Sequence, residues 1–304
     1  MKKVLVVYYT QSGQLLEILK SLMRPLEESG RVSVTYEELR PVPKFPFPWK
    51  PLEFFGVQPE SVLEVAGGLE PYRFDPQEDY DLIVLGYQIW FLSPSIPVNS
   101  FLRSPAAARC LKNKPVVTVI GCRNMWLMAQ EQVKRRLCEL SARLVVNLPY
   151  GDRAANLVSL VTIVAWMFSG KQDYFKALPR AGVSRQDIDG AGRHGSLLLQ
   201  YLLDDLPNRP ATLFEQCPAE VDPRLIGVER AGRRIFKIWA KLIRSRGGPE
   251  DRSRTLRVRV FMVYLTLVLT LLFPLTYLVY RIQKLVNPRG LQRKVAYFSG
   301  RSPD

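Results

Sequence analysis

The sequence predicts an α/β protein with a doubly wound parallel sheet, and two observations carry this prediction. Short runs of Val, Ile, Leu and Tyr recur along the first 150 residues, and they are too apolar for strands with a solvent-facing side. Longer stretches between them repeat apolar residues at helical spacing. Strands that alternate with helices form parallel sheets covered on both faces, and such strands read as continuous hydrophobic runs.

The predicted strands and helices follow one another in order. The first strand covers residues 4–9, and a polar loop at 10–14 separates it from a helix whose leucines recur from Leu15 to Leu26. The remaining strands are predicted at residues 32–36, 81–86, 115–121 and 143–148, and the remaining helices at 126–140 and 195–206. These elements are expected to form one domain over residues 1–206.

The positive charge of the chain is concentrated at one end. The formal net charge is +15, but residues 1–229 hold 26 Lys and Arg against 25 Asp and Glu, whereas residues 230–304 hold 17 against three. A nearly neutral body does not favour nucleic acid as a partner. Four cysteines without a C-x-x-C pair, and a single histidine, argue against both a disulfide scaffold and a metal site.

The basic end of the chain divides into four predicted segments. Residues 207–229 are expected to be a linker, and residues 230–247 a basic amphipathic helix. A hydrophobic membrane segment is expected at 258–282, before a basic tail at 283–304.

The membrane prediction rests on length and flanking charge. The 21 residues from Val260 to Tyr280 carry no charge and as a helix would span roughly 31 Å, close to the thickness of a bilayer core. The arginines at both ends favour anionic membrane lipids as partners. Without a recognisable signal peptide, the predicted place is the cytoplasmic face of the membrane, with this segment as a C-terminal anchor. A buried core helix, or a re-entrant hairpin bent at Pro274, is the alternative.

Two segments are predicted to be insertions in the α/β domain. Residues 41–60 combine closely spaced prolines with Phe45, Phe47 and Trp49, a composition that opposes regular structure and predicts a stiff, irregular arm. Residues 154–170 are uncharged but short for a bilayer span, which favours a buried or interfacial helix. The arm forms either a wall of an apolar substrate pocket or a surface covering without function.

Three loops are candidates for a ligand site, because ligands of such sheets bind beyond the carboxyl ends of the strands. The loop at 10–14 supplies hydroxyl groups and a glycine before a helix, which predicts an anion cradle. It has no lysine and is therefore not a triphosphate-binding P-loop. The alternative is an ordinary capped helix start, because Ser and Thr cap helices in any case.

The other two loops offer groups for a planar ligand. In the loop at 87–97, Trp90 and Phe91 follow a predicted strand end, where a ring can stack on a planar cofactor. They could instead cover the sheet edge or pack on the proline-rich segment. The loop at 121–126 offers backbone groups and Asn124 to the polar edge of a ring.

These motifs resemble the flavodoxin-like family. Thr10-x-Ser12-Gly13 is similar to its phosphate loop, and the segments 86–91 and 97–102 are similar to its flavin-stacking loop and the following helix. The resemblance covers about residues 1–150. It implies a five-stranded sheet of order 2-1-3-4-5 and non-covalently bound FMN. The FMN-binding residues that it implies are Thr10, Gln11, Ser12, Gly13, Gln14, Leu15, Gln88, Ile89, Trp90, Phe91, Gly121, Cys122, Asn124 and Trp126. Leu15 and Gln88 depart from the common pattern, which often has Thr and Pro there.

A narrower resemblance is to a bacterial subgroup labelled dialkylresorcinol condensing enzyme. It is carried by the opening VLVVYYTQSGQL and by the segments 45–49, 54–55 and 59–63. It implies aromatisation of a dialkyl cyclohexanedione to a dialkylresorcinol, with a ketosynthase and an acyl carrier as partners. The condensation named in the label normally needs an activated Cys with His partners, and four scattered cysteines with one histidine do not favour it.

The sequence therefore predicts an FMN-dependent oxidoreductase that acts on a lipophilic small molecule. A membrane-tethered electron carrier or quinone reductase, and a non-catalytic component of a condensing complex, are the alternatives. The one histidine, His194, stands in a predicted glycine-rich loop and is the candidate for a catalytic base.

Overall fold

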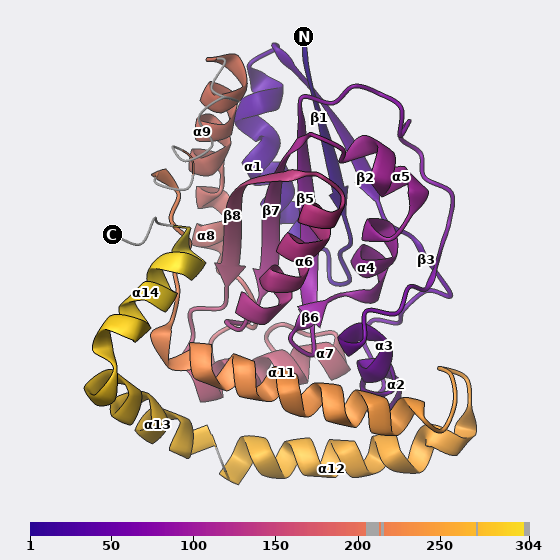
Figure 1. Ribbon diagram of the computed structural model, residues 1–304, viewed down its shortest axis with the longest axis vertical. Helices are drawn as coiled ribbons and strands as arrows, with labels where there is room; N and C mark the ends of the chain where they lie inside the picture. The colour runs from indigo at the N-terminus through magenta and orange to yellow at the C-terminus, as the bar shows by residue number, and fades with distance from the viewer. Residues whose placement is uncertain (205–212, 214–215, 272, 301–304) are drawn as a thin grey trace.

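The computed structural model describes residues 1–204, 213, 216–271 and 273–300, except for the side chains of residues 270–279. Five parallel strands form its sheet, in the spatial order β2-β1-β5-β7-β8 (Figure 1). They are β1 (Lys2–Tyr8), β2 (Val32–Glu38), β5 (Leu82–Trp90), β7 (Pro115–Cys122) and β8 (Arg143–Gly151). Counted along the chain this is the order 2-1-3-4-5, so the predicted doubly wound fold is confirmed.

Helices cover both faces of the sheet, because successive residues of a buried strand point to opposite sides. Val4 and Val6 of β1 belong to the core beneath α1 (Gln14–Glu28) and α9 (Gly192–Leu203). Leu5 and Val7 belong to the opposite core, beneath α4 (Ile96–Leu102) and α6 (Leu127–Glu139). Two shorter helices, α8 (Arg185–Gly190) and α5 (Pro105–Cys110), complete the layers.

The residues around His194 are helical, which corrects the predicted loop. α8 and α9 follow each other almost directly, and Gly195 allows α9 to approach α1 closely. A Cβ added at Gly195 would lie 2.0 Å from the carbonyl oxygen of Leu22. Gly195 therefore serves a helix contact here rather than a turn.

Gly195→Ala is expected to lower the free energy of unfolding by about 1–3 kcal/mol, because the added methyl group overlaps backbone that cannot rotate away. Gly192→Ala is the matched control, because its Cβ would make only ordinary contact, 3.5 Å from the nearest atom, the carbonyl oxygen of Ser21. Urea denaturation of both variants measures the difference. Equal stability of the two variants would contradict the close contact.

Both predicted insertions contain helices. In the first, α2 (Pro51–Gly56) and α3 (Gln58–Val62) replace the irregular structure expected after residue 50. Each carries a proline in its first turn, where no backbone N–H is needed, so the prolines begin these helices rather than prevent them. The second insertion forms α7 (Asn156–Ser169), which contacts the first: Trp49 N–H donates to the carbonyl of Met167 at 2.9 Å. β3 (Pro41–Val42) and β4 (Gly68–Leu69) form a separate two-stranded sheet.

The basic end of the chain forms a belt of helices, in which α11 and α12 run along the lower end of the α/β domain and α13 and α14 turn up one side of it (Figure 1). The belt consists of α11 (Pro223–Arg244), a short 3₁₀ turn (Arg252–Arg254), α12 (Thr255–Leu271), α13 (Phe273–Val286) and α14 (Pro288–Ser299). The predicted basic amphipathic helix is thus α11, which begins seven residues earlier, inside the predicted linker. Most of residues 207–215 in that linker, and the last residues of the predicted basic tail, lie outside the described part of the chain.

The single membrane-spanning helix expected at 258–282 is not supported. Two helices, α12 and α13, lie on either side of residue 272, and Pro274 stands in the first turn of α13, as prolines favour. α12 also packs on the body through Val258 and Phe261, both almost fully buried. Within the described residues, we find no helix that combines the length and the hydrophobicity needed to cross a bilayer.

Candidate functional site

The three predicted loops meet at one edge of the sheet. β1 lies between β2 and β5, and β5 lies between β1 and β7, all parallel. The loops that follow β1, β5 and β7 therefore leave neighbouring strand ends. The strand order reverses between β1 and β5, and ligands of doubly wound sheets bind at that point.

The first loop is shaped by one glycine and one hydroxyl group. Gly13 precedes α1 with φ of +84°, and its N–H donates to Thr10 Oγ1 at 3.1 Å. Residues 10–14 are half-buried, and the N–H groups of the first turn of α1 have no partner within the helix. An anion is stabilised at such a helix start by these N–H groups and by the helix dipole. The predicted cradle is present in the backbone.

Two side chains of this loop that are predicted to bind FMN make hydrogen bonds to distant backbone groups of the chain. Gln11 Nε2 donates to the carbonyl of Pro46 at 2.9 Å. The Gln14 amide pairs with the backbone of Val183, donating at 3.1 Å and accepting at 2.9 Å. Leu15 is buried, and its side chain packs against Gly121 of the third loop. The side chains left to face an anion are those of Thr10 and Ser12.

The second loop starts later than the sequence predicts. β5 continues through Gln88 and Ile89 to Trp90, because Gln88 pairs with Gly121 of β7 and Ile89 with Pro94 of β6 (Ser93–Pro94). The Trp90 ring is almost fully buried. It makes edge contacts with three aromatic rings, at centroid distances of 5.0–5.9 Å, and those rings belong to Tyr9, Phe45 and Trp49. The proline-rich insertion thus encloses the predicted stacking residue.

Phe91 and Leu92 form the turn between β5 and β6, with φ of +51° and +58°. This conformation is strained for bulky residues, so contacts from elsewhere must hold it. The Phe91 ring lies 4.7 Å from the ring of Phe54 and also contacts Phe236 of α11 and Phe261 of α12. The Phe91 ring therefore contacts the helical belt, and its predicted flavin-stacking role stays a prediction.

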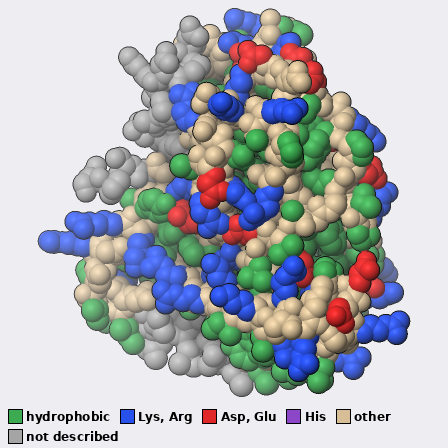
Figure 2. Space-filling model, turned by 45° about the vertical axis from the view of Figure 1, so that its right-hand side comes forward, with side chains coloured by type: hydrophobic (Ala, Val, Ile, Leu, Met, Phe, Trp, Pro, Cys, Tyr) green, Lys and Arg blue, Asp and Glu red, His purple; other side chains and the backbone are tan. Residues whose placement is uncertain are grey.

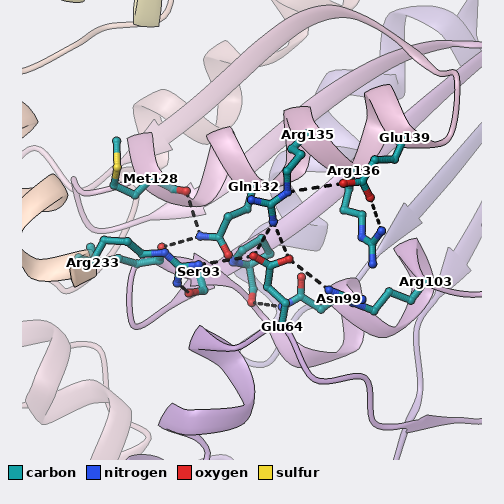
Figure 3. Close-up of polar contacts among 12 residues, drawn as sticks. Glu64, Ser93, Asn99, Arg103, Met128, Gln132, Arg135, Arg136, Glu139 and Arg233 are labelled. Carbon is teal, nitrogen blue, oxygen red and sulfur yellow. Dashed lines mark hydrogen bonds and ion pairs between the residues drawn. The ribbon is translucent and has the colours of Figure 1, made fainter. Parts of the chain in front are cut away.

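Polar contacts also hold this turn (Figure 3). Gln132 Nε2 donates to the carbonyl of Leu92 at 3.1 Å, and Arg233 of α11 donates to Ser93 Oγ. Burial lowers the pKa of Arg233 to about 10, and its partner charge is Glu64, at 3.5 Å. Glu64 also accepts from Arg103 and from Arg135. The belt is thus coupled to the second loop through buried charged groups.

The third loop is fixed by α7. Asn124 Nδ2 and Arg123 both donate to the Asn156 side-chain oxygen, at 2.8 and 2.6 Å. The Cys122 thiol donates to the carbonyl of Tyr150 at 3.7 Å, and burial raises the pKa of that thiol well above its usual value. Trp126 is buried at the start of α6. Cys122 is therefore held as a neutral thiol, and Asn124 is oriented by a side chain of the insertion.

Three buried polar atoms at this site have no hydrogen-bond partner in the described part of the chain. They are Gln88 Oε1, Asn124 Oδ1 and Trp49 Nε1. Buried polar groups are nearly always paired, by protein, water or ligand. The Gln88 and Asn124 oxygens are acceptors at the ends of β5 and β7, and Trp49 Nε1 is a donor beside Trp90. Such a set of groups fits a planar heterocycle that has both donors and acceptors along its edge. Together with the cradle before α1, they fit the phosphate and ring of FMN.

One charged residue near this edge was not predicted. Glu229 of α11 is fully buried at the start of α6, where its Oε2 accepts from the Met128 N–H at 2.9 Å. Burial raises the pKa of Glu229 to about 7, although the N–H groups at residues 126–128 act in the opposite direction. Its Oε1 has no described partner. The sequence did contain a signal, because Glu229 is the one acidic residue between Pro223 and Gly248.

Glu229→Gln is expected to change how stability depends on pH. The pKa of Glu229 in the folded chain lies above its unfolded value of about 4.5, because burial favours the protonated carboxyl group. The contribution of Glu229 to the free energy of unfolding is therefore fully present below pH 4.5 and is lost as the pH rises through 7. At pH 8 the variant should gain about 3 kcal/mol relative to wild type, and at pH 4 the two should be equal. Urea denaturation from pH 4 to pH 8 measures this, with Glu131→Gln as the control. Parallel pH profiles of wild type and Glu229→Gln would contradict the buried charge.

His194 lies away from these contacts. Its Nδ1 and the Tyr150 hydroxyl are 2.8 Å apart, on α9 and the edge strand β8. Burial, and then the charge of Arg193, lower the pKa of His194. None of the contacts described for His194 reaches the three loops, so its role as a catalytic base stays a prediction.

Solved structures with a similar arrangement are flavoproteins and flavodoxins. A flavoprotein from Lactobacillus acidophilus, solved in complex with FMN, is 12% identical, with a TM-score of 0.39 over 49% of this chain and 93% of that one. A flavodoxin from Archaea and oxidised flavodoxin 1 from Bacillus cereus are each 12% identical with TM-scores of 0.37. Both similarities cover 66% of this chain. They cover 98% of the archaeal flavodoxin and 99% of flavodoxin 1 from Bacillus cereus. No family model and no curated protein matches the chain. The dialkylresorcinol resemblance therefore stays a prediction, and the fold rests on the strand order seen here.

Proposed function

We propose that this chain is a flavoprotein that binds FMN across the three loops and carries out redox chemistry with it. The observation that carries the proposal is the juxtaposition at one sheet edge. A glycine-shaped cradle opens α1, and unpaired polar atoms of Gln88 and Asn124 lie at the neighbouring strand ends. A phosphate and a polar heterocycle are the two ligand parts that these groups suit.

The residues of the site have separate tasks in this proposal. The first turn of α1 and the Ser12 hydroxyl would bind the phosphate. Gln88 and Asn124 would orient the ring by its polar edge, and Trp90 would flank it. When bound, FMN supplies hydride or single-electron transfer. Glu229 Oε1, whose carboxyl group titrates near neutral pH, is positioned to hold a proton beside the third loop.

A lipophilic substrate suits the surroundings of this site better than a protein redox partner. The proline-rich insertion places the rings of Phe45 and Trp49 against Trp90, and a wall of this kind excludes water and binds apolar molecules. A shuttling electron carrier instead exposes its flavin to partners. We extend the proposal to the reaction implied by the narrower resemblance, in which a dialkyl cyclohexane-1,3-dione loses two hydrogens and becomes a dialkylresorcinol.

Anaerobic mixing of the FMN-loaded protein with an alkylated cyclohexane-1,3-dione tests this reaction. The expected result is loss of the absorbance of oxidised flavin, with one resorcinol formed per flavin reduced. If the absorbance is unchanged by the dione but falls with a flavodoxin reductase and NADPH, the chain is an electron carrier and the oxidoreductase proposal is wrong.

A further inference from the structure

The helix α12 carries an exposed apolar stripe. Four apolar residues recur at intervals of four, three and four, which places them along one side of the helix. Their side chains are 49–71% exposed, and they are Leu256, Val260, Val263 and Leu267, here called the α12 face. The opposite side of α12 packs on the body through Val258 and Phe261. The α12 face therefore points away from the protein.

Basic residues outnumber acidic ones in the segment that carries the α12 face. Ten Lys and Arg, and no Asp or Glu, occur between Arg252 and Pro303. Arg252 is exposed in the 3₁₀ turn before α12, Arg259 is exposed in α12, and Lys241 is exposed near the end of α11. Figure 2 shows apolar side chains at the lower end of the molecule with Lys and Arg side chains beside them. Glu250 and Asp251 precede this segment, and Asp251 caps the 3₁₀ turn.

We infer that the α12 face lies in the interfacial region of a membrane that contains anionic lipids, with the helix parallel to the surface. Apolar side chains on one side enter the acyl boundary, and the neighbouring arginines contact lipid phosphates. A second copy of the chain is a poor occupant, because it would bring two strongly basic segments together. This inference is independent of FMN binding, and either can fail without the other.

The position of α12 gives this surface a connection to the candidate site. Phe261 reaches inward from the buried side of α12 to the Phe91 ring, at 6.3 Å between centroids, and Phe91 forms the turn after β5. A membrane on the outer side of α12 therefore lies one helix away from the second loop.

Sedimentation of the full-length protein with vesicles tests the inference. Vesicles of phosphatidylcholine mixed with phosphatidylglycerol should bind the protein, vesicles of phosphatidylcholine alone should bind it much less, and high salt should weaken the binding. Val263→Asp should lower the partition coefficient at least about tenfold, through lost burial and repulsion by the anionic surface. The matched control is Val42→Asp, because Val42 is similarly exposed, at 55%, but lies on β3.

Three outcomes would overturn the inference. The first is equal loss of binding in Val263→Asp and Val42→Asp, and the second is equal binding to both kinds of vesicle. The third is that light scattering finds a dimer for the wild-type protein and a monomer for Val263→Asp, and that neither protein sediments with vesicles. Val263 is 62% exposed, so the variant is expected to fold, and its circular dichroism melting curve checks this.

Discussion

Ser12→Glu is expected to weaken FMN binding by the full-length chain at least about 100-fold. The substitution removes a hydroxyl group that would donate to the phosphate, which is worth about 1.5–3 kcal/mol for a charged acceptor. It also places a carboxylate at the helix start, where the phosphate would lie, and two anions cannot share the same N–H groups. Equilibrium dialysis of FMN against both proteins measures the change.

The control for this variant places the same charge far from the loop. Ser196 is an exposed residue of α9, and Ser196→Glu should bind FMN as the wild-type chain does. A second pair of variants, Gly13→Ala and Gly30→Ala, distinguishes the effect of backbone strain in α1 from the effect of a side chain placed at the phosphate loop. Both glycines have positive φ, and a Cβ at either would meet nothing within 4 Å, but Gly30 lies at the other end of α1. If Ser12→Glu keeps its affinity for FMN, the phosphate does not lie at this loop.

Arg254→Ala is expected to lower the free energy of unfolding by about 3–5 kcal/mol, because it leaves a buried carboxylate underpaired. Glu60 of α3 is 6% exposed and Arg254 is 3% exposed, and their side chains form two hydrogen bonds of 2.9 Å. Arg244, which is more exposed, supplies a third. Urea denaturation of the full-length chain measures the loss.

The neighbouring Arg252 supplies the matched control for this effect. It lies in the same 3₁₀ turn but is exposed, so Arg252→Ala should change the free energy of unfolding by less than about 0.5 kcal/mol. The double variant Glu60→Gln with Arg254→Ala should recover part of the loss, because no buried charge then lacks a partner. If Arg254→Ala and Arg252→Ala are equally stable, the belt is not held on the body by this ion pair.

The sheet was predictable because its strands are buried on both faces. β1 and β7 read as uninterrupted apolar runs, and their bounds are predicted to within two residues. The strand predicted at residues 81–86 ends four residues before β5 does, because Gly86 resembles a strand end. In the structure, Gly86 is required within the strand, since a Cβ there would lie 2.8 Å from the side chain of Leu19. The glycine is needed because α1 packs across the sheet at this point, and a local sequence pattern does not reveal that contact.

The site was only partly predictable, because distant segments decide what each side chain does. The glycine turn before α1 follows from local residues, and anion binding at it stays a prediction. Phe91 looked like a cofactor contact, but it packs on α11 and α12, more than 140 residues later in the chain. Glu229 reaches the start of α6 from the same belt. The prediction ended the α/β domain at residue 206 and assigned the later segments to a linker and the membrane, so it had no means of placing these contacts.

FMN binding by the full-length protein is the most direct test of the central claim. Equilibrium dialysis should give one FMN per chain, and riboflavin, which lacks the phosphate, should bind much more weakly because the cradle before α1 has no anion to hold. Fluorescence of the bound FMN should be quenched by Trp90. Absence of FMN binding, or equal affinity for FMN and riboflavin, would contradict the account of the three loops as a flavin site.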